Sequence, residues 1–398
     1  MERHQFTNSR NSMNQMMKPE KTKSPVYATF PGFSGLGCCI ALPWNRRSLL
    51  FFAIVLVTAL PLEARQTDPR TWTKTSSSTS VLLPPEYRPP EPQTRVFQKG
   101  EFKLTLYSRK FATGDMVYAE IEPVLAPGQK MSEELKRKLG LNQLKYNGLQ
   151  VKLVERPWGL RGLFAIYPHQ KENGWLGWTY PLKQKSATGE ETGFESTRLQ
   201  VHITKFPVYT SELKLGKYSN VQTYEKPGVA ERIKRERELK NKAFASREDN
   251  YIKDKLAHPR DLHKITSPFY VTRVTYRYEI KNGKKIKHPP KRYVHKGLDL
   301  RGWVGHPVFA MAPGKVVLSR ELFFEGGFVL LDHGNGIKSG YMHLSELKAK
   351  EGQIVEAGDL IAKAGATGMV TAAHLHLSIW VNGYPVDPLS LLSLPVRY

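Results

Sequence analysis

The sequence predicts a mainly β protein with two folded domains joined by a charged helical linker. Short alternating apolar and polar segments recur between residues 96 and 206, as expected for strands that each bury one face. A second set of strand-like segments with glycine at most bends follows residue 263. At 398 residues the chain exceeds what one hydrophobic core usually holds, so two domains are expected.

Residues 1–65 are expected to be an N-terminal export signal or a membrane anchor. Arg46 and Arg47 precede an uncharged apolar run over residues 49–62, which is short for a membrane span and typical of a signal-peptide core. Residues 62–64 (Leu-Glu-Ala) suit cleavage. The long polar lead leaves open a later translation start or an uncleaved anchor, and export is the favoured alternative. Contact with a membrane is expected only through this segment.

Residues 66–95 are rich in serine and proline and are predicted to be an extended tether, because such a composition buries too little apolar surface to fold. The chain has two cysteines, Cys38 and Cys39, which both precede the apolar run. After cleavage the protein would contain no cysteine. We therefore expect neither a disulfide framework nor a thiolate metal site.

Residues 96–206 are predicted to form a small β-sandwich with an immunoglobulin-like topology. The evidence is a series of alternating apolar and polar runs separated by turn residues such as Asn147-Gly148. Trp158, Trp175 and Trp178 are either core and surface aromatics of this domain or a sugar-stacking surface, and the first alternative is favoured.

Residues 207–262 are predicted to be a linker with one charged helix between Pro227 and Leu256. Its thin apolar stripe indicates a solvated connector that packs on one side, and Glu236 and Lys240 are spaced as a favourable i,i+4 pair. Residues 263–398 are predicted to form an antiparallel β domain. A basic insertion over residues 281–292 is expected to form one wall of its cleft, where it either receives a substrate carboxylate or is a solvated loop.

The formal charge of +24 favours an acidic partner. The basic residues are dispersed, and no helix-turn-helix, zinc-finger or RNA-binding signature accompanies them, so nucleic acid is not the expected partner. Cell-wall polymers also carry carboxylates and are compatible with this charge.

Four residues of the C-terminal domain carry metal-ligand chemistry. His295 and Asp299 lie four residues apart, and His374 and His376 lie two apart in an alternating segment. On a β-strand both imidazoles would face one cleft, while Leu375 and Leu377 face the core. Two histidines and one carboxylate are the three protein ligands of a catalytic zinc that leaves its fourth position to water.

These residues resemble the lysostaphin-type (LytM-type) zinc metallopeptidases, which cut the peptide part of bacterial cell walls. The resemblance covers roughly residues 263–390 and places the family's His-x-x-x-Asp motif on His295 and Asp299. It places the His-x-His motif on His374 and His376, and a Tyr-x-His-Leu segment on His343. Where the family commonly has Gly-Pro before His-x-His, this chain has Ala372-Ala373.

The resemblance implies that His295, Asp299 and His376 bind Zn²⁺ and that His343 and His374 are catalytic. In the expected mechanism, His374 serves as general base, and His343 stabilises the oxyanion or assists the leaving amine; the order of these two roles stays open. Two other histidines of the domain, His306 and His333, lie in turn-like glycine contexts and are expected to be structural.

The resemblance also implies a zinc-dependent endopeptidase that hydrolyses peptidoglycan stems or crosslinks during wall remodelling or lysis, in the periplasm or cell envelope. The alternative is a non-catalytic module of the same fold that binds the wall and activates a separate amidase. The sequence indicates neither the bond that is cut, nor the role of the sandwich, nor the oligomeric state.

Overall fold

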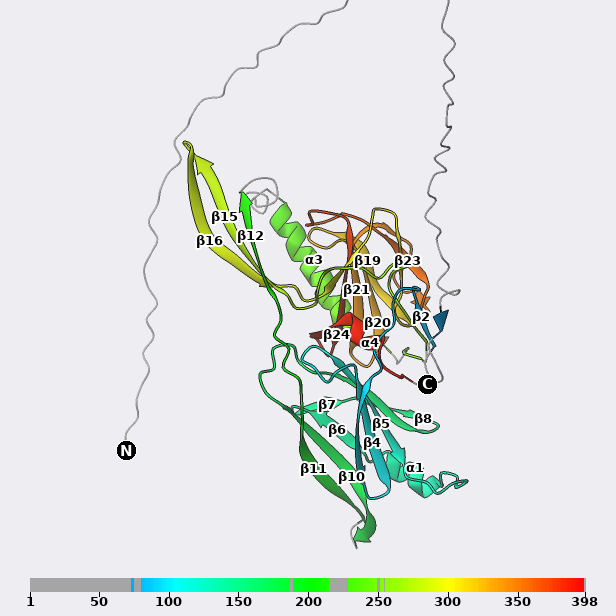
Figure 1. Cartoon of the computed structure of the whole chain (residues 1–398). Coiled ribbons are helices and arrows are strands. Elements are labelled where there is room, and N and C mark those ends of the chain that lie inside the picture. Colours follow the sequence, from blue (N-terminus) through cyan, green and yellow to red (C-terminus); the bar gives the residue numbers. More distant parts are fainter. Residues whose placement is uncertain are drawn as a thin grey trace, which may run out of the picture. The chain divides into compact units, whose positions relative to one another are not determined.

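The computed structural model describes residues 73–74, 80–186, 189–214, 228–248, 251–253 and 255–396 (Figure 1). The predicted export segment lies outside these residues. Strands make up 52% and helices 9% of these described residues, which confirms a mainly β protein. Within the described part, no helix combines the length and hydrophobicity that a bilayer crossing requires.

Residues 93–201 contain two antiparallel sheets that enclose one hydrophobic core. The first sheet has the order β3-β4-β5-β9-β8 and the second has the order β11-β10-β6-β7. Side chains from both sheets share the core, for example Leu104 and Trp178. The immunoglobulin-like topology of this domain stays a prediction. The elements are β3 (Gln93–Lys99), β4 (Phe102–Ser108), β5 (Met116–Pro123), α1 (Glu133–Leu139), β6 (Gln143–Tyr146), β7 (Leu149–Val151), β8 (Leu153–Arg156), β9 (Gly159–Ala165), β10 (Gly174–Ser186) and β11 (Gly189–Leu199).

The C-terminal domain is built on a ten-stranded sheet in which every pairing is antiparallel, as the sequence predicts. Its main path is β14-β17-β24-β21-β20-β19-β22, so β24 lies centrally between β17 and β21. The elements are β14 (Ile265–Ser267), β17 (Leu298–Arg301), β18 (Pro307–Phe309), β19 (Gly314–Leu322), β20 (Gly326–Gly334), β21 (Ile337–Leu347), β22 (Ile354–Val355), β23 (Leu360–Ala364), β24 (His374–Val381), β25 (Tyr384–Val386) and α4 (Pro388–Leu391).

A separate three-stranded sheet, β12-β15-β16, consists of an antiparallel hairpin with one parallel strand at its edge (Figure 1). Its elements are β12 (Val208–Lys214), β15 (Thr272–Lys281) and β16 (Lys284–Val294). The basic insertion expected at residues 281–292 is therefore the turn and second strand of this hairpin. Asn282 and Gly283 both have positive φ, of 50° and 70°, as a two-residue type I′ hairpin turn requires.

The predicted linker helix is α3 (Val229–Phe244), and it packs on the C-terminal domain. Ala243 and Phe244 contact a cluster of β19 and β20 residues, and the Phe244 ring meets Trp380 edge-on at 4.9 Å. The predicted Glu236–Lys240 pair is wrong. Glu236 pairs with Arg232, one turn earlier (Nε–Oε1, 2.6 Å), while Lys240 reaches Glu325 in the C-terminal domain. Tertiary contacts thus redirect both charges.

Part of the predicted tether also packs on the C-terminal domain. Residues 80–83 form β2 (Ser80–Leu83), which pairs in parallel with β13 (Lys255–Ala257) and antiparallel with β1 (Thr73–Lys74). Leu82 and Leu83 are fully buried, and the Tyr87 ring stacks on His263 at 4.1 Å. A few apolar residues are enough to dock this segment, although its average composition is that of a tether.

A partly buried ionic group joins the sandwich domain to α4. Arg109 donates to Asp115 Oδ1 and to Asp387 Oδ2, each over 2.8 Å, and Asp387 also caps the N-terminus of α4. Two further hydrogen bonds accompany it, from Met116 N to Ser390 Oγ and from Asp387 N to Gly114 O.

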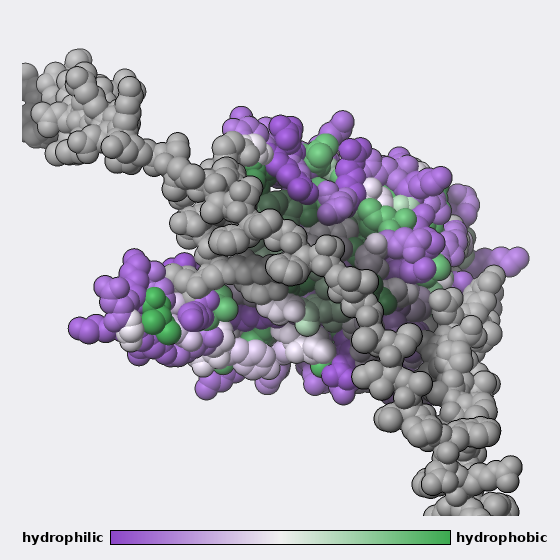
Figure 2. All heavy atoms as spheres, turned by 90° about the horizontal axis from the view of Figure 1, so that it is seen from above, coloured by the Kyte–Doolittle hydropathy of each residue, from purple (hydrophilic) through white to green (hydrophobic). Residues whose placement is uncertain are grey.

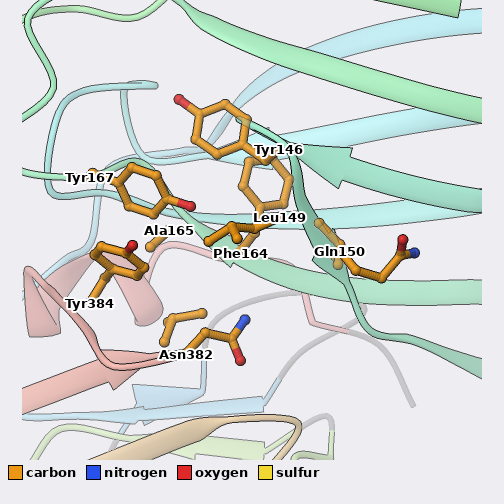
Figure 3. Close-up of a pocket in the computed structure, with 10 residues that line it drawn as sticks. Tyr146, Leu149, Gln150, Phe164, Ala165, Tyr167, Asn382 and Tyr384 are labelled. Carbon is orange, nitrogen blue, oxygen red and sulfur yellow. The ribbon is translucent and has the colours of Figure 1, made fainter. Parts of the chain in front are cut away.

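A small pocket lies beside this contact, lined by sandwich residues and by the turn between β24 and β25 (Figure 3). Tyr167 and Tyr384 both line it, and their rings are in contact, with centroids 4.1 Å apart. The pocket contains none of the candidate metal ligands.

The visible face in Figure 2 is mostly hydrophilic, with smaller hydrophobic patches. Several of the exposed large hydrophobic residues belong to the β15–β16 hairpin: Tyr276, Ile280, Ile286 and Tyr293.

Candidate metal centre

Strand β24 brings the two halves of the predicted site together. It pairs with β17 so that Asp299 lies opposite His376 and Arg301 opposite His374. Leu375 and Leu377 are fully buried, which confirms the predicted alternation between core and cleft. His295 lies just before β17, where its backbone exchanges hydrogen bonds with Tyr270 and Val271.

His295, Asp299 and His376 offer three ligand atoms that lie within 4.8 Å of one another. Asp299 Oδ1 lies 2.9 Å from His295 Nε2 and 2.8 Å from His376 Nδ1, and the two ring nitrogens are 2.9 Å apart. His295 and Asp299 are only 5% and 6% exposed. The structure therefore places together the three residues that the sequence singles out as ligands.

The hydrogen bonds on the far side of each ring indicate which nitrogen carries a lone pair. His295 Nδ1 lies 3.1 Å from the carbonyl of Pro268, to which it can only donate, so Nε2 is the unprotonated nitrogen of the neutral ring. His376 Nε2 lies 3.0 Å from Ser378 Oγ, whose own hydrogen is directed at the carbonyl of Lys296. With Nε2 donating to Ser378, the lone pair of His376 is on Nδ1.

Three acceptor atoms therefore converge: two ring lone pairs and one carboxylate oxygen. Such a buried group of acceptors is repulsive unless a cation lies between them, and the outer hydrogen bonds are those that orient metal-bound histidines. This arrangement fits a zinc ion with two nitrogen ligands and one oxygen ligand.

The protonation states of His376 and Asp299 also suit metal binding. Burial lowers the pKa of His376, so its ring is neutral at pH 7. Burial by itself would raise the pKa of Asp299, but a proton on the facing nitrogen of His295 or His376 would lower it more, so the carboxylate is ionised whether a proton or a metal cation lies between these atoms.

Arg273 is part of this site and was not found from the sequence. Its Nη2 donates to Asp299 Oδ2 over 2.9 Å and to Ser267 Oγ over 2.7 Å. Arg273 thereby binds Asp299 Oδ2, the oxygen that faces away from the histidines, while Oδ1 faces His295 and His376. Arg273 lies 26 residues from Asp299 on β15, and no local motif signals a contact over that separation.

His343 and His374 flank the three ligand candidates. Their ring centroids are 4.9 Å apart, and His374 Nε2 lies 3.6 Å from Asp299 Oδ1. His343 Nδ1 donates to Thr367 O over 3.0 Å, and His374 Nδ1 donates to Ala372 O over 2.9 Å. In the neutral form each ring therefore presents an unprotonated Nε2. The Ala372-Ala373 departure still supplies the carbonyl that orients His374.

The backbone of His343 is held in the left-handed region, with φ of 64°. This conformation is unusual for a residue with a Cβ, and it is typical of positions that the surrounding structure fixes for function. Burial, with the adjacent His374 and His376, lowers the pKa of His343 to about 4, so this ring is also neutral at pH 7.

His333 and His306 lie away from the three candidate ligands in the hydrogen-bond network and have other partners. His333 is buried, with Nδ1 2.7 Å from Pro313 O and Nε2 2.7 Å from Ser339 Oγ. His306 Nδ1 lies 3.3 Å from Arg260 Nη2. In the sandwich, Trp178 is a core residue at 3% exposure while Trp175 is 49% exposed, so the three tryptophans do not form one sugar-stacking surface.

Residues 293–388 match the model of Peptidase family M23. Those residues are an M23 (LytM-type) peptidase domain. The match includes all five candidate site residues.

The similar curated proteins include peptidoglycan DD-endopeptidases from Vibrio cholerae. The peptidoglycan DD-endopeptidase ShyB is 38% identical over 114 residues, which are 28% of this chain and 26% of that protein. The peptidoglycan DD-endopeptidase ShyA is 39% identical over 102 residues, which are 25% of this chain and 24% of that protein. The chain thus spans about a quarter of the length of these relatives.

Among solved structures, a candidate M23 peptidase from Pseudomonas aeruginosa is 24% identical, with a TM-score of 0.44, and covers 71% of this chain and 95% of that one.

Proposed function

We propose that this protein is a zinc-dependent endopeptidase that hydrolyses peptide bonds in peptidoglycan stems or crosslinks. The observation that carries the proposal is the convergence of three buried acceptor atoms, from His295, Asp299 and His376, beside two further histidines with free ring nitrogens. The M23 domain match and the peptidoglycan endopeptidases among the relatives support the reaction and its substrate class.

His295 Nε2, Asp299 Oδ1 and His376 Nδ1 would hold the zinc ion. When bound there, zinc supplies Lewis-acid polarisation of a carbonyl group and a water of lowered pKa, ~7 in catalytic zinc sites. Arg273 and Ser378 keep the ligand side chains in place by binding the atoms that face away from the ion.

His374 and His343 would move the protons of amide hydrolysis. Each neutral ring has its proton fixed on Nδ1 by a backbone carbonyl, so Nε2 is free to accept a proton from the attacking water. The ring that accepts this proton becomes a donor at Nε2. It can then stabilise the developing oxyanion or deliver the proton to the leaving amine. His374 Nε2 is the better placed to accept first, because it lies 3.6 Å from the candidate ligand atom Asp299 Oδ1 and therefore beside the proposed metal position.

The β15–β16 hairpin is the proposed site of contact with substrate carboxylates outside the cleft. Residues 272–294 contain eight Lys/Arg and one Asp/Glu. One face of the hairpin begins at Arg273, which contacts the candidate ligand Asp299, so this basic surface leads to the metal centre. A peptidoglycan substrate implies a location in the cell envelope, which the protein would reach by export.

The competing proposal is a non-catalytic wall-binding module that activates a separate amidase. The presence of all five candidate residues in one cluster favours the enzyme. Metal content by itself does not separate the two proposals, because a non-catalytic module with intact ligands would also bind zinc.

The test combines zinc analysis of the purified chain with digestion of purified cell walls, with and without chelator. We expect stoichiometric zinc, chelator-sensitive clearance and new free amines. His343→Ala should lower turnover by ~10²–10³ because it removes one proton-transfer or oxyanion group. His169→Ala, at an exposed histidine of the sandwich, is the control. Zinc without hydrolysis would favour the amidase activator, and full activity of the His343 variant would contradict its assigned role.

A further inference from the structure

The linker helix α3 contacts the C-terminal domain at the turn between β19 and β20, residues 323–325. Glu236 is the charged residue of α3 that is buried, at 9% exposure, and its Oε2 accepts a hydrogen bond from Phe323 N over 2.8 Å. Lys240, one turn later, forms an ion pair with Glu325, whose side chain is only 16% exposed. A helix that served only as a spacer would not need a buried carboxylate directed at a backbone N–H group.

The same turn holds the catalytic candidate His343 by its backbone. His343 N donates to Glu325 O over 2.8 Å. This hydrogen bond holds the residue in its left-handed conformation, which an L-residue leaves readily when nothing opposes it. The direction of the imidazole therefore depends on where the Glu325 carbonyl lies.

The turn also holds the segment that orients the His343 ring. Phe324 O accepts a hydrogen bond from Met369 N over 2.9 Å, and Gly327 N donates to Thr367 Oγ1 over 2.9 Å. Gly326 packs so closely that a Cβ at this position would lie 2.3 Å from Thr367 Oγ1. Thr367 O is the acceptor for His343 Nδ1. Backbone and ring of His343 are thus both held by residues packed on one turn.

We propose that α3 is a positioning element of the active site, with Glu236 and Lys240 as positioning residues that hold turn 323–325 and through it His343. The inference rests on the proposed catalytic role of His343. It assigns the linker a second task besides joining two domains: a displaced α3 leaves the metal ligands in place but lets His343 relax.

The experiment uses the full chain with four substitutions. Glu236→Ala removes the acceptor for Phe323 N, and Glu236→Gln keeps an acceptor oxygen at that position. Lys240→Met removes the charge and keeps the side-chain stem. Glu238→Ala is the matched control, because Glu238 is an exposed glutamate of the same helix.

Kinetics on a soluble peptide substrate should show a split between kcat and KM. We expect Glu236→Ala and Lys240→Met to lower kcat by roughly 10-fold or more, with KM within about two-fold and zinc content unchanged, since a misplaced catalytic group affects the chemical step. Glu236→Gln and the control should stay near wild type. Wild-type kcat in both Glu236→Ala and Lys240→Met, or an equal loss in the Glu238 control, would overturn the proposal.

Amide hydrogen exchange of the peptide that contains His343 gives a readout independent of activity. Exchange should accelerate in Glu236→Ala and Lys240→Met and not in the control, because the bond from His343 N to Glu325 O opens more often. Unchanged exchange in both variants would overturn the inference even if no peptidase activity were found. Accelerated exchange in a protein without activity would contradict the proposed function and leave the positioning role of α3 intact.

Discussion

Gly297 gives a test of how tightly the metal centre is packed. It lies between His295 and Asp299, and a Cβ added there would lie 2.5 Å from His376 Nε2, 2.5 Å from Leu377 O and 2.6 Å from Ser378 Oγ. The glycine is not among the residues with positive φ, so Gly297→Ala changes the occupied space and not the backbone preference. Two of these three atoms, His376 Nε2 and Ser378 Oγ, are the partners of the hydrogen bond that orients the His376 ring.

The extra methyl group has no room unless β24 moves away from β17, because Leu377 O is a backbone atom and Leu298 pairs with Leu377. Overpacking of this kind costs about 1–3 kcal/mol of stability. Displacing the His376 ring from its Ser378 partner should also weaken zinc binding by about 10–100-fold.

The assay is competition for zinc against a chelator at fixed pH, together with thermal unfolding of the same samples. Gly140→Ala is the control, because its Cβ would meet only Arg137 O at an ordinary 3.4 Å, far from the metal centre in the sequence. A Gly297→Ala protein that binds zinc as tightly as wild type and unfolds at the same temperature would refute the reasoning about His376.

Three further predictions concern other parts of the molecule. Burial lowers the pKa of His333 from 6.5 to about 4, so as the pH falls the unfolded state takes up a proton on this ring before the folded state does. The free energy of unfolding should therefore fall by up to about 3 kcal/mol as the pH drops from 6.5 to 4. Denaturant titrations should show a shallower pH dependence of stability for His333→Gln. Neutralising exposed cations of the hairpin by Lys284→Gln, Lys287→Gln and Lys291→Gln should weaken binding to purified cell walls and reduce the salt dependence of that binding. Cleavage of a short uncharged peptide should change little. A sedimentation assay at two salt concentrations that shows unchanged wall binding would contradict the carboxylate-binding role. Arg109→Met should destabilise the folded chain by about 3–5 kcal/mol, because it leaves two partly or fully buried carboxylates without their cation; calorimetry that shows wild-type stability would contradict this assignment.

Local sequence patterns and the family resemblance were sufficient to single out the candidate site residues. The alternation of His374 to Leu377 predicted which side chains face the cleft and which the core, because a β-strand has a fixed period of two. The His-x-x-x-Asp spacing predicted a second pair of ligands. The antiparallel β architecture followed from short strand-like segments separated by turns, and the hairpin turn at Asn282-Gly283 is itself encoded by the two residue types that tolerate positive φ.

Only the tertiary structure decided the long-range contacts. Arg273 reaches Asp299 because β15 runs beside the first ligand segment, and Glu236 leaves its expected partner Lys240 because Phe323 N and Arg232 are better placed. Residues 80–83 join a sheet with residues 255–257, although their surroundings have the composition of a tether. Such contacts depend on which surfaces meet after folding. The sequence therefore determined the candidate site residues of this protein, and the packing around them decided how those residues are held.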